Sequence, residues 1–218
     1  MRLLVSSLAL LLLALVAVGA YRFVRRSPAA GPAFVAASVA GAPFSYPLAL
    51  ARDGTTRMGG EVDHLAFLVV FPDFAAAPSA SADPKLRAAQ EQDENRLFIL
   101  VTPKDEAIDP AARPSRLYAR FLEGEVLAAP GSLMMRRFEA GSPYELEQLY
   151  LAPPDGSSFF ARCPKPEAGF MGAAPCLWAL RRGAFDVELR FSPALLEHWE
   201  RLAEGTLAFL RSVEARDQ

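Results

Sequence analysis

The hydrophobic pattern of the chain begins with one long apolar segment. Residues 3–20 contain two serines and no charged side chain. In a helix these residues extend over roughly 27 Å, which is enough to cross the hydrocarbon core of a bilayer. A helix buried in a soluble domain usually keeps one polar face, and this segment has none. We therefore predict a transmembrane anchor or signal helix over residues 1–22.

The end of this segment leaves two fates open. Val18 and Ala20 have the small or tolerated side chains found at an A-x-A-like cleavage site, so cleavage after Ala20 is one fate. A retained anchor, which we favour, is the other. The predicted location is therefore the inner membrane with the domain in the periplasm, or the periplasm itself after cleavage.

Residues 23–43 have the composition of a linker. Alanine, proline, glycine and serine dominate this stretch from Ser27 onward, and such stretches seldom form regular packed elements. We predict a linker over residues 23–43 and a folded domain over residues 44–216.

Apolar segments of strand length follow the linker. Residues 63–71 are apolar on both faces after their first two positions and stop at Pro72, as in a central strand. Asp83 and Pro84 are residue types favoured at the N-cap and first position of a helix, so a short charged helix is expected there. Residues 115–123 fit either a helix or an irregular strand, and both remain open. The other strands predicted in this part are residues 44–51, 97–101 and 133–138.

The C-terminal third alternates more regularly. In residues 185–191 the odd positions are apolar and the even positions are charged, which predicts one face turned inward and one turned outward. Turn sequences at residues 153–156 and at Arg182-Gly183 divide this region into an antiparallel meander. The strands predicted for the meander are residues 146–151, 157–163, 176–182 and 185–191.

A helix is predicted after the last strand. Ser192 and Pro193 suit its N-cap and first position, and the apolar residues that follow recur at helical spacing. Gly205 lies inside this helix at a cost of about 1 kcal/mol relative to alanine, which predicts a bend or close packing. The fold class expected is α+β, an antiparallel sheet with a C-terminal packing helix, preceded by one N-terminal transmembrane or signal helix.

The charge distribution argues against a nucleic-acid partner. The formal net charge is −2, but the first 26 residues hold four arginines and no acid, which leaves the remainder at about −6. Affinity for nucleic acid comes largely from basic surfaces that neutralise phosphates. We therefore expect no nucleic-acid partner.

Cys163 and Cys176 are the only cysteines of the chain. If their flanking segments pair as antiparallel strands, the two cysteines lie opposite each other at the neck of a long hairpin, at a separation that suits a disulfide. Two buried, reduced thiols are the alternative. We favour the disulfide, because an even number of cysteines coincides with an export segment.

Two signals disagree about the side of the membrane. Arg22, Arg25 and Arg26 favour a cytoplasmic domain under the positive-inside rule. A disulfide persists only outside the cytosol. We follow the cysteines and predict an extracytoplasmic domain.

No set of residues forms a catalytic signature. His64 and His198 are the only histidines, and a strand edge and a helix border are the simpler interpretations of their positions. Carboxylate pairs such as Glu145 with Glu147, or Glu123 with Glu125, are spaced for one face of a strand and are expected to meet solvent. We predict no catalytic residue, no metal site and no cofactor.

Two features are candidates for contact with a partner. Phe170 and Met171 occupy the tip of the loop between the cysteines, and an exposed aromatic with a methionine is typical of a protein-binding hot spot. The alternative is that Phe170 folds back onto the core. Arg136-Arg137 and Arg181-Arg182 are suited to an anionic partner, with solvated strand ends as the alternative.

Three features resemble small exported or membrane-anchored proteobacterial proteins of unassigned function. They are the FPDF sequence at Phe71–Phe74, the single cysteine pair, and the sequence FSPALLEHWERL at Phe191–Leu202. The resemblance covers the domain from residue 44 onward and implies no catalytic residues.

These observations favour a non-enzymatic protein of the periplasm that binds another protein. An envelope accessory subunit and a toxin-neutralising immunity protein both fit. The expected partners are the membrane, through Leu3–Ala20, and a protein whose identity the sequence does not give. An envelope hydrolase with a carboxylate-based site is the alternative, and binding of a small ligand in a groove of the α+β domain is a third possibility.

Overall fold

The computed structural model describes residues 33–166 and 175–215. The chain forms two units, residues 1–33 and 34–218, and all of the described elements belong to the second. The anchor or signal helix predicted over residues 1–22 lies outside the described residues. Among the residues that are described, no helix has the length and apolar character needed to span a membrane.

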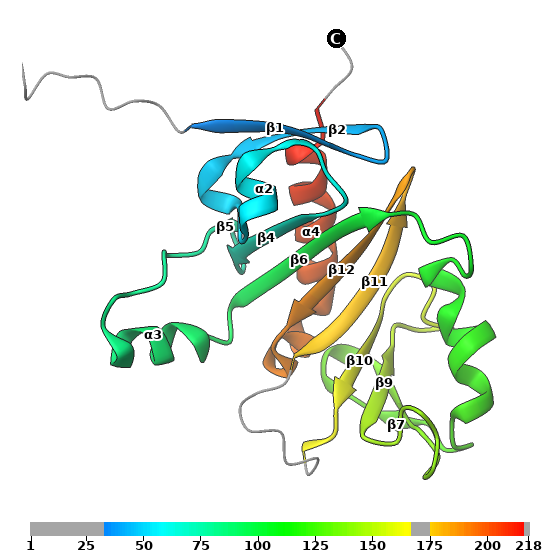
Figure 1. Cartoon of the computed structure of the whole chain (residues 1–218). Coiled ribbons are helices and arrows are strands. Elements are labelled where there is room, and N and C mark those ends of the chain that lie inside the picture. Colours follow the sequence, from blue (N-terminus) through cyan, green and yellow to red (C-terminus); the bar gives the residue numbers. More distant parts are fainter. Residues whose placement is uncertain (1–32, 167–174, 216–218) are drawn as a thin grey trace, which may run out of the picture. The chain divides into compact units, whose positions relative to one another are not determined.

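The first elements form a small sheet of three strands in the order β2-β1-β3. Strand β1 (Phe34–Val39) pairs antiparallel with β2 (Ala42–Pro47) and parallel with β3 (Gly60–Glu61). Residues 34–43, predicted as linker, are therefore part of a hairpin (Figure 1). Burial alternates along β1 with a period of two residues, so that Ala37 and Val39 are buried. The small side chains of this strand make the alternation hard to recognise in the sequence.

The main sheet has nine strands, and each pairs antiparallel with its neighbours. In spatial order they are β5 (Ala75–Ala76), β4 (Leu65–Val70), β6 (Arg96–Pro103), β12 (Phe185–Phe191), β11 (Cys176–Arg182), β10 (Phe160–Pro164), β9 (Glu147–Leu151), β8 (Met134–Arg137) and β7 (Leu127–Ala128). The predicted meander is present as β9 to β12. Its second strand begins later than predicted, at Phe160, because the chain still turns up to residue 158.

Short helical elements lie between the strands, and one long helix follows them. Asp83 and Ser192 cap helices as predicted, since their side chains accept the backbone N–H groups of Lys85 and Ala194. The segment left open at residues 115–123 is helical as far as Phe121. The helical elements are η1 (Leu48–Leu50), α2 (Gly54–Met58), α3 (Pro84–Glu91), η2 (Pro110–Ala112), η3 (Pro114–Tyr118), η4 (Ala119–Phe121), η5 (Pro130–Ser132), η7 (Pro193–His198) and α4 (Trp199–Val213).

Helix α4 packs against one face of the main sheet and forms the core with it (Figure 1). The ring of Phe67 in β4 lies 5.4 Å from Phe209 of α4 and 4.9 Å from Tyr46 of β2, measured between ring centroids. Trp199, at the start of α4, donates a hydrogen bond of 2.9 Å to the carbonyl of Gly131. The fold is thus α+β, with an antiparallel sheet and a C-terminal packing helix, as the sequence predicts.

Candidate protein-binding face

The other face of the main sheet has no helix in front of β6 and β12 among the described elements (Figure 1). Directly paired residues of antiparallel strands point to the same side, so the strand register identifies the side chains of this face. We call it the open face, and it comprises Ala66, Leu68 and Val70 of β4, Arg96, Phe98 and Leu100 of β6, Glu188 and Arg190 of β12, and Leu177 of β11.

Most of the open face is apolar and only half-buried. Leu68, Phe98 and Leu100 are each accessible to solvent, whereas Phe67 and Ile99 on the α4 side are fully buried. Adjoining apolar side chains that stay in contact with water mark a surface suited to another molecule.

The open face ends at β11, because the helical segment η2–η4 covers the next strands on the same side. Tyr118 of η3 lies with its ring centroid 6.1 Å from Phe160 of β10 and 6.0 Å from Phe138. Arg162 of β10 lies over the same ring at 5.5 Å, and it pairs with Glu147 at 2.7 Å. Segment η2–η4 therefore forms a wall beside the open face.

One ion pair occupies the open face. The Nε–H of Arg190 donates to Oε1 of Glu188 at 2.7 Å. The guanidinium carbon of Arg190 lies 5.8 Å from the ring centroid of Phe98, its cross-strand partner. The Arg190 side chain is 48% exposed, so a charged group that is held in place still faces solvent.

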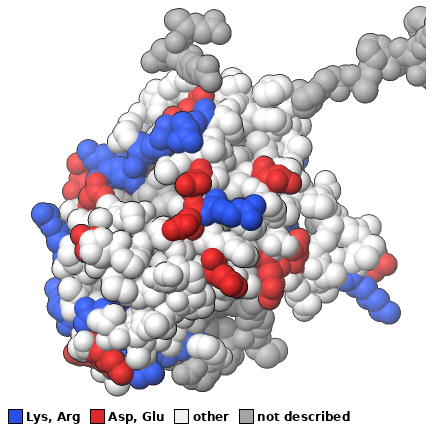
Figure 2. Space-filling model, turned by 180° about the vertical axis from the view of Figure 1, so that it is seen from behind, with Lys and Arg blue, Asp and Glu red and all other residues white. Residues whose placement is uncertain are grey.

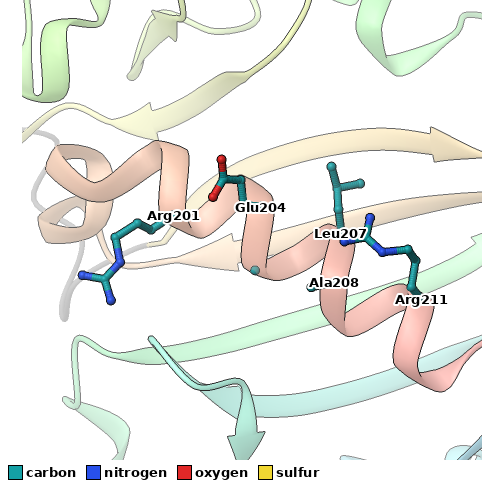
Figure 3. Close-up of a pocket in the computed structure, with 6 residues that line it drawn as sticks. Arg201, Glu204, Leu207, Ala208 and Arg211 are labelled. Carbon is teal, nitrogen blue, oxygen red and sulfur yellow. The ribbon is translucent and has the colours of Figure 1, made fainter.

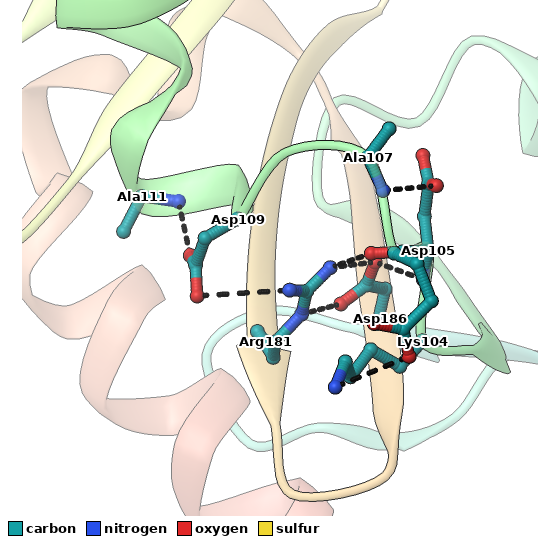
Figure 4. Close-up of polar contacts among 8 residues, drawn as sticks. Lys104, Asp105, Ala107, Asp109, Ala111, Arg181 and Asp186 are labelled. Atoms are coloured by element: carbon teal, nitrogen blue, oxygen red, sulfur yellow. Dashed lines mark hydrogen bonds and ion pairs between the residues drawn. The ribbon is translucent and has the colours of Figure 1, made fainter.

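A second arginine at the end of β11 fixes the wall in position (Figure 4). Arg181 donates from Nε to Asp186 at 2.7 Å and from Nη2 to the other oxygen of this carboxylate at 2.9 Å. It also donates to the carbonyl of Asp105 and lies 3.9 Å from Asp109, which caps η2. Burial alone would raise the pKa of Asp186, but the hydrogen bonds from Arg181 and Asp105 outweigh it, and the pKa is lowered.

The predicted disulfide is present and joins the two parts of the main sheet. Cys163 and Cys176 are bonded, with their Cα atoms 4.1 Å apart. Arg162 opposite Leu177 is the one register pair between β10 and β11 in the described residues, and the cysteines stand next to it. The disulfide therefore holds the covered strands against the strands of the open face.

The arginines that were candidates for binding an anionic partner are bound to groups of this chain instead. Phe170 and Met171 lie outside the described residues. Arg181 is bound to Asp186, and Arg182 is bound to Glu214. Arg137 lies 3.6 Å from Glu125, and Arg136 donates to the carbonyl of Glu123. These arginines thus bind groups of this chain at strand ends, whereas the alternative in the sequence analysis was solvated strand ends.

The two histidines also have structural contacts. His64 lies between Asp63, at 2.7 Å from Nδ1, and Asp53, at 3.0 Å from Nε2. The hydrogen bond with Asp53 is the main reason why the pKa of His64 is raised. Asp53 at the same time caps α2 by accepting the N–H of Thr56 at 2.8 Å. His198 stacks on Phe71 with ring centroids 6.1 Å apart.

The predicted carboxylate pairs serve local structure as well. Glu147 is bound to Arg162, and Glu145 accepts the N–H of Gly141 at 2.7 Å. In the part of the chain that is described, no group of three or more His, Cys, Asp or Glu side chains is arranged to hold a metal ion.

The opposite side of the molecule has a shallow hollow on the outer surface of α4 (Figure 3). Acidic and basic side chains lie beside one another across this side (Figure 2). The hollow is lined by Arg201, Glu204, Gly205, Leu207, Ala208 and Arg211. The open face is more apolar and is the better candidate for a binding surface.

The open face is not apparent from the sequence of its strands. Residues 63–71 and 97–101 are apolar at nearly every position, which is also the pattern of strands buried on both sides. The one sequence feature that indicates the open face is the strict alternation of apolar and charged residues in β12. Its even-numbered residues point away from α4. Once β12 is paired with β6, that alternation places Phe98 and Leu100 on the exposed side.

Comparison with known proteins gives a likeness of fold. No family model matches the sequence, and no curated protein matches it either. The structure is similar to that of Smlt3025, an immunity protein of the Stenotrophomonas maltophilia type IV secretion system, with a TM-score of 0.60 and 17% sequence identity over 85% of this chain and 94% of that chain. At this identity the likeness shows a similar fold and no more.

A second solved structure, the iron-regulated outer membrane lipoprotein FrpD of Neisseria meningitidis, is more distant. Its TM-score is 0.41 with 9% sequence identity, over 82% of this chain and 92% of that chain. This score is too low to establish a common fold.

Proposed function

We propose that this chain is a non-enzymatic protein of the bacterial envelope that protects its own cell by binding a toxic protein. The observation that carries the proposal is the open face, an apolar sheet surface in contact with solvent beside a wall of helical turns. Apolar area with an aromatic ring and an arginine at its centre is the composition of protein interface cores.

The likeness of fold supports the immunity role over the accessory role. Smlt3025 is an immunity protein, and the match extends over nearly all of that chain, 94%. A fold is able to host many functions, so the likeness adds to the argument from the open face and does not replace it.

The disulfide supports a place outside the cytosol, because the bond between Cys163 and Cys176 needs an oxidising compartment. We propose that the domain lies in the periplasm and that Leu3–Ala20 holds it at the inner membrane. A toxin delivered to the periplasm would meet the open face there.

Deletion of the gene followed by co-culture in contact with the parent strain tests this function. We expect the deletion strain to lose viability beside the parent, and the full chain supplied from a plasmid to restore it. A deletion strain that survives as well as the parent would contradict the immunity role.

A further inference from the structure

We propose that the open face receives an acidic segment of its protein partner and that Arg190 binds a carboxylate of this segment. The inference rests on the proposed function, because it names the chemistry of the partner at the same surface. Three observations carry it: the geometry of Arg190, the balance of charge around the open face, and the apolar frame of the ion pair.

The guanidinium group of Arg190 is held ready for a ligand. Its Nε–H is used by Glu188 at 2.7 Å, and its plane lies near the ring of Phe98. The two terminal nitrogens make no hydrogen bond to a described residue. An arginine fork with free terminal N–H groups fits a carboxylate through two parallel hydrogen bonds.

The charged side chains of the wall, residues 110–121, are all arginines, and Asp105, Glu106 and Asp109 precede them in the chain. The two carboxylates that β12 directs to this side, Asp186 and Glu188, are each paired with an arginine. Arg113, Arg116 and Arg120 follow one another along the wall, and none has a carboxylate within 4.0 Å among the described residues. Arg113 is close enough for its charge to lower the pKa of Asp186. The chain beyond residue 26 is acidic overall, so this run of arginines is a property of the wall and not of the whole protein.

The surroundings of Arg190 favour a strong interaction with an anion. Its direct cross-strand neighbours are Phe98 and Leu177, both apolar. A partner that covers these side chains would exclude water around the guanidinium, and the loss of water strengthens an ion pair. A basic partner would meet Arg190 and the arginines of the wall with repulsion, so the acidic occupant is the one that the charges favour.

A matched arginine on the other side of the molecule supplies the control. Arg201 of α4 lies over the ring of Phe71 at 5.6 Å, much as Arg190 lies over Phe98 at 5.8 Å. In both cases the guanidinium lies over an aromatic ring, but only Arg190 belongs to the open face.

The first step of the test identifies the partner segment. The full chain carrying the photocrosslinker p-benzoylphenylalanine in place of Leu100 is expressed in its own cells during co-culture, and the crosslinked peptide is sequenced. We expect a peptide that contains Asp or Glu. The same crosslinker at Leu86 of α3, which is 59% exposed and is not part of the open face, is the control and should not capture this peptide.

The second step measures affinity of the purified full chain for that protein. We expect Arg190→Glu to weaken binding by about thirtyfold or more, since loss of one partner of a covered charge pair has effects of this size. Arg190→Lys should retain part of the affinity, and Arg201→Glu should leave it unchanged. Replacing the Asp or Glu of the crosslinked partner peptide with a basic residue should restore binding to the Arg190→Glu variant.

The outcomes separate this inference from the proposed function. A crosslinked peptide without an acid, or Arg190→Glu binding like the unaltered chain, overturns the acidic partner and leaves protein binding intact. If no protein is crosslinked at Leu100, both the inference and the binding role of the open face are overturned.

Discussion

Gly205 of α4 and Phe74 are in direct contact, with no room for a side chain between them. A Cβ atom at Gly205 would stand 2.2 Å from Cε2 of the Phe74 ring. Phe74 also has a φ of 53°, an unusual value for a residue other than glycine. The segments FPDF and FSPALLEHWERL meet nearby through Phe71 and His198.

Gly205→Ala should therefore destabilise the protein. In a helix interior the change normally stabilises by about 1 kcal/mol, but here the new methyl group meets a ring that is packed in place. We expect a loss of roughly 1–3 kcal/mol in the free energy of unfolding, measured by chemical denaturation. Gly124→Ala, where nothing lies within 4 Å, is the control and should be close to neutral. An increase in stability for Gly205→Ala would show that the ring moves freely.

Loss of the disulfide should lower stability without changing the fold. Cys163 and Cys176 are separated by 13 positions, and closing a loop of this length stabilises by about 3 kcal/mol. The variant with both cysteines changed to alanine should unfold at lower denaturant concentration and should not respond to reductant. An unaltered chain whose denaturation midpoint ignores reductant would contradict the stabilising role of the bond.

The pair of His64 and Asp53 should make stability depend on pH. The pKa of His64 is raised above 6.5, so its contribution is complete below that pH and is lost as the pH rises through the folded-state value. Burial opposes ionisation of Asp53, but hydrogen bonds from Thr56 and His64 lower its pKa below 3.8, so its contribution is lost only in stronger acid.

His64→Gln tests this dependence, because it removes the titrating group. The difference in free energy of unfolding between the unaltered chain and the variant should be largest between the two ordinary values, 3.8 and 6.5, and should shrink toward pH 8. A difference that grows with pH would refute the assignment.

Two arginine–carboxylate pairs on neighbouring strands should respond differently to substitution. Asp186 is 11% exposed and binds both Arg181 and the backbone of Asp105, so Asp186→Asn should lower the melting temperature. Arg190 is 48% exposed, and Arg190→Gln should leave the melting temperature nearly unchanged. Calorimetry of the two variants distinguishes a residue that stabilises the fold from one that is available for binding. A large loss of stability in Arg190→Gln would remove it from the candidate site.

Much of the fold follows from local pattern. The alternation in residues 185–191 predicts β12 correctly, because one of its faces is buried against α4 and the other is not. The pairing of the segments around Cys163 and Cys176 also follows, since a meander of short strands brings residues at its neck together. The helix caps at Asp83 and Ser192 each depend on a single side chain, so the sequence also predicts them.

The rest depends on which elements pack together, and local pattern does not carry that information. Strand β1 was not predicted because its residues are mostly small, as in a linker. Small residues are nevertheless buried when a neighbouring strand packs closely against them. The open face was missed because Leu68, Phe98 and Leu100 are as apolar as core residues. Only the placement of α4 on the opposite side leaves them in contact with solvent.

The most direct measurement is the protection that the double variant Leu68→Gln with Leu100→Gln gives to the deletion strain in co-culture. Both substitutions make the open face polar at half-buried positions, and an unchanged melting temperature confirms that the fold is kept. Leu86→Gln on α3 is the control. We predict that the double variant fails to protect, whereas Leu86→Gln protects fully. Full protection by the double variant would contradict a role for the open face.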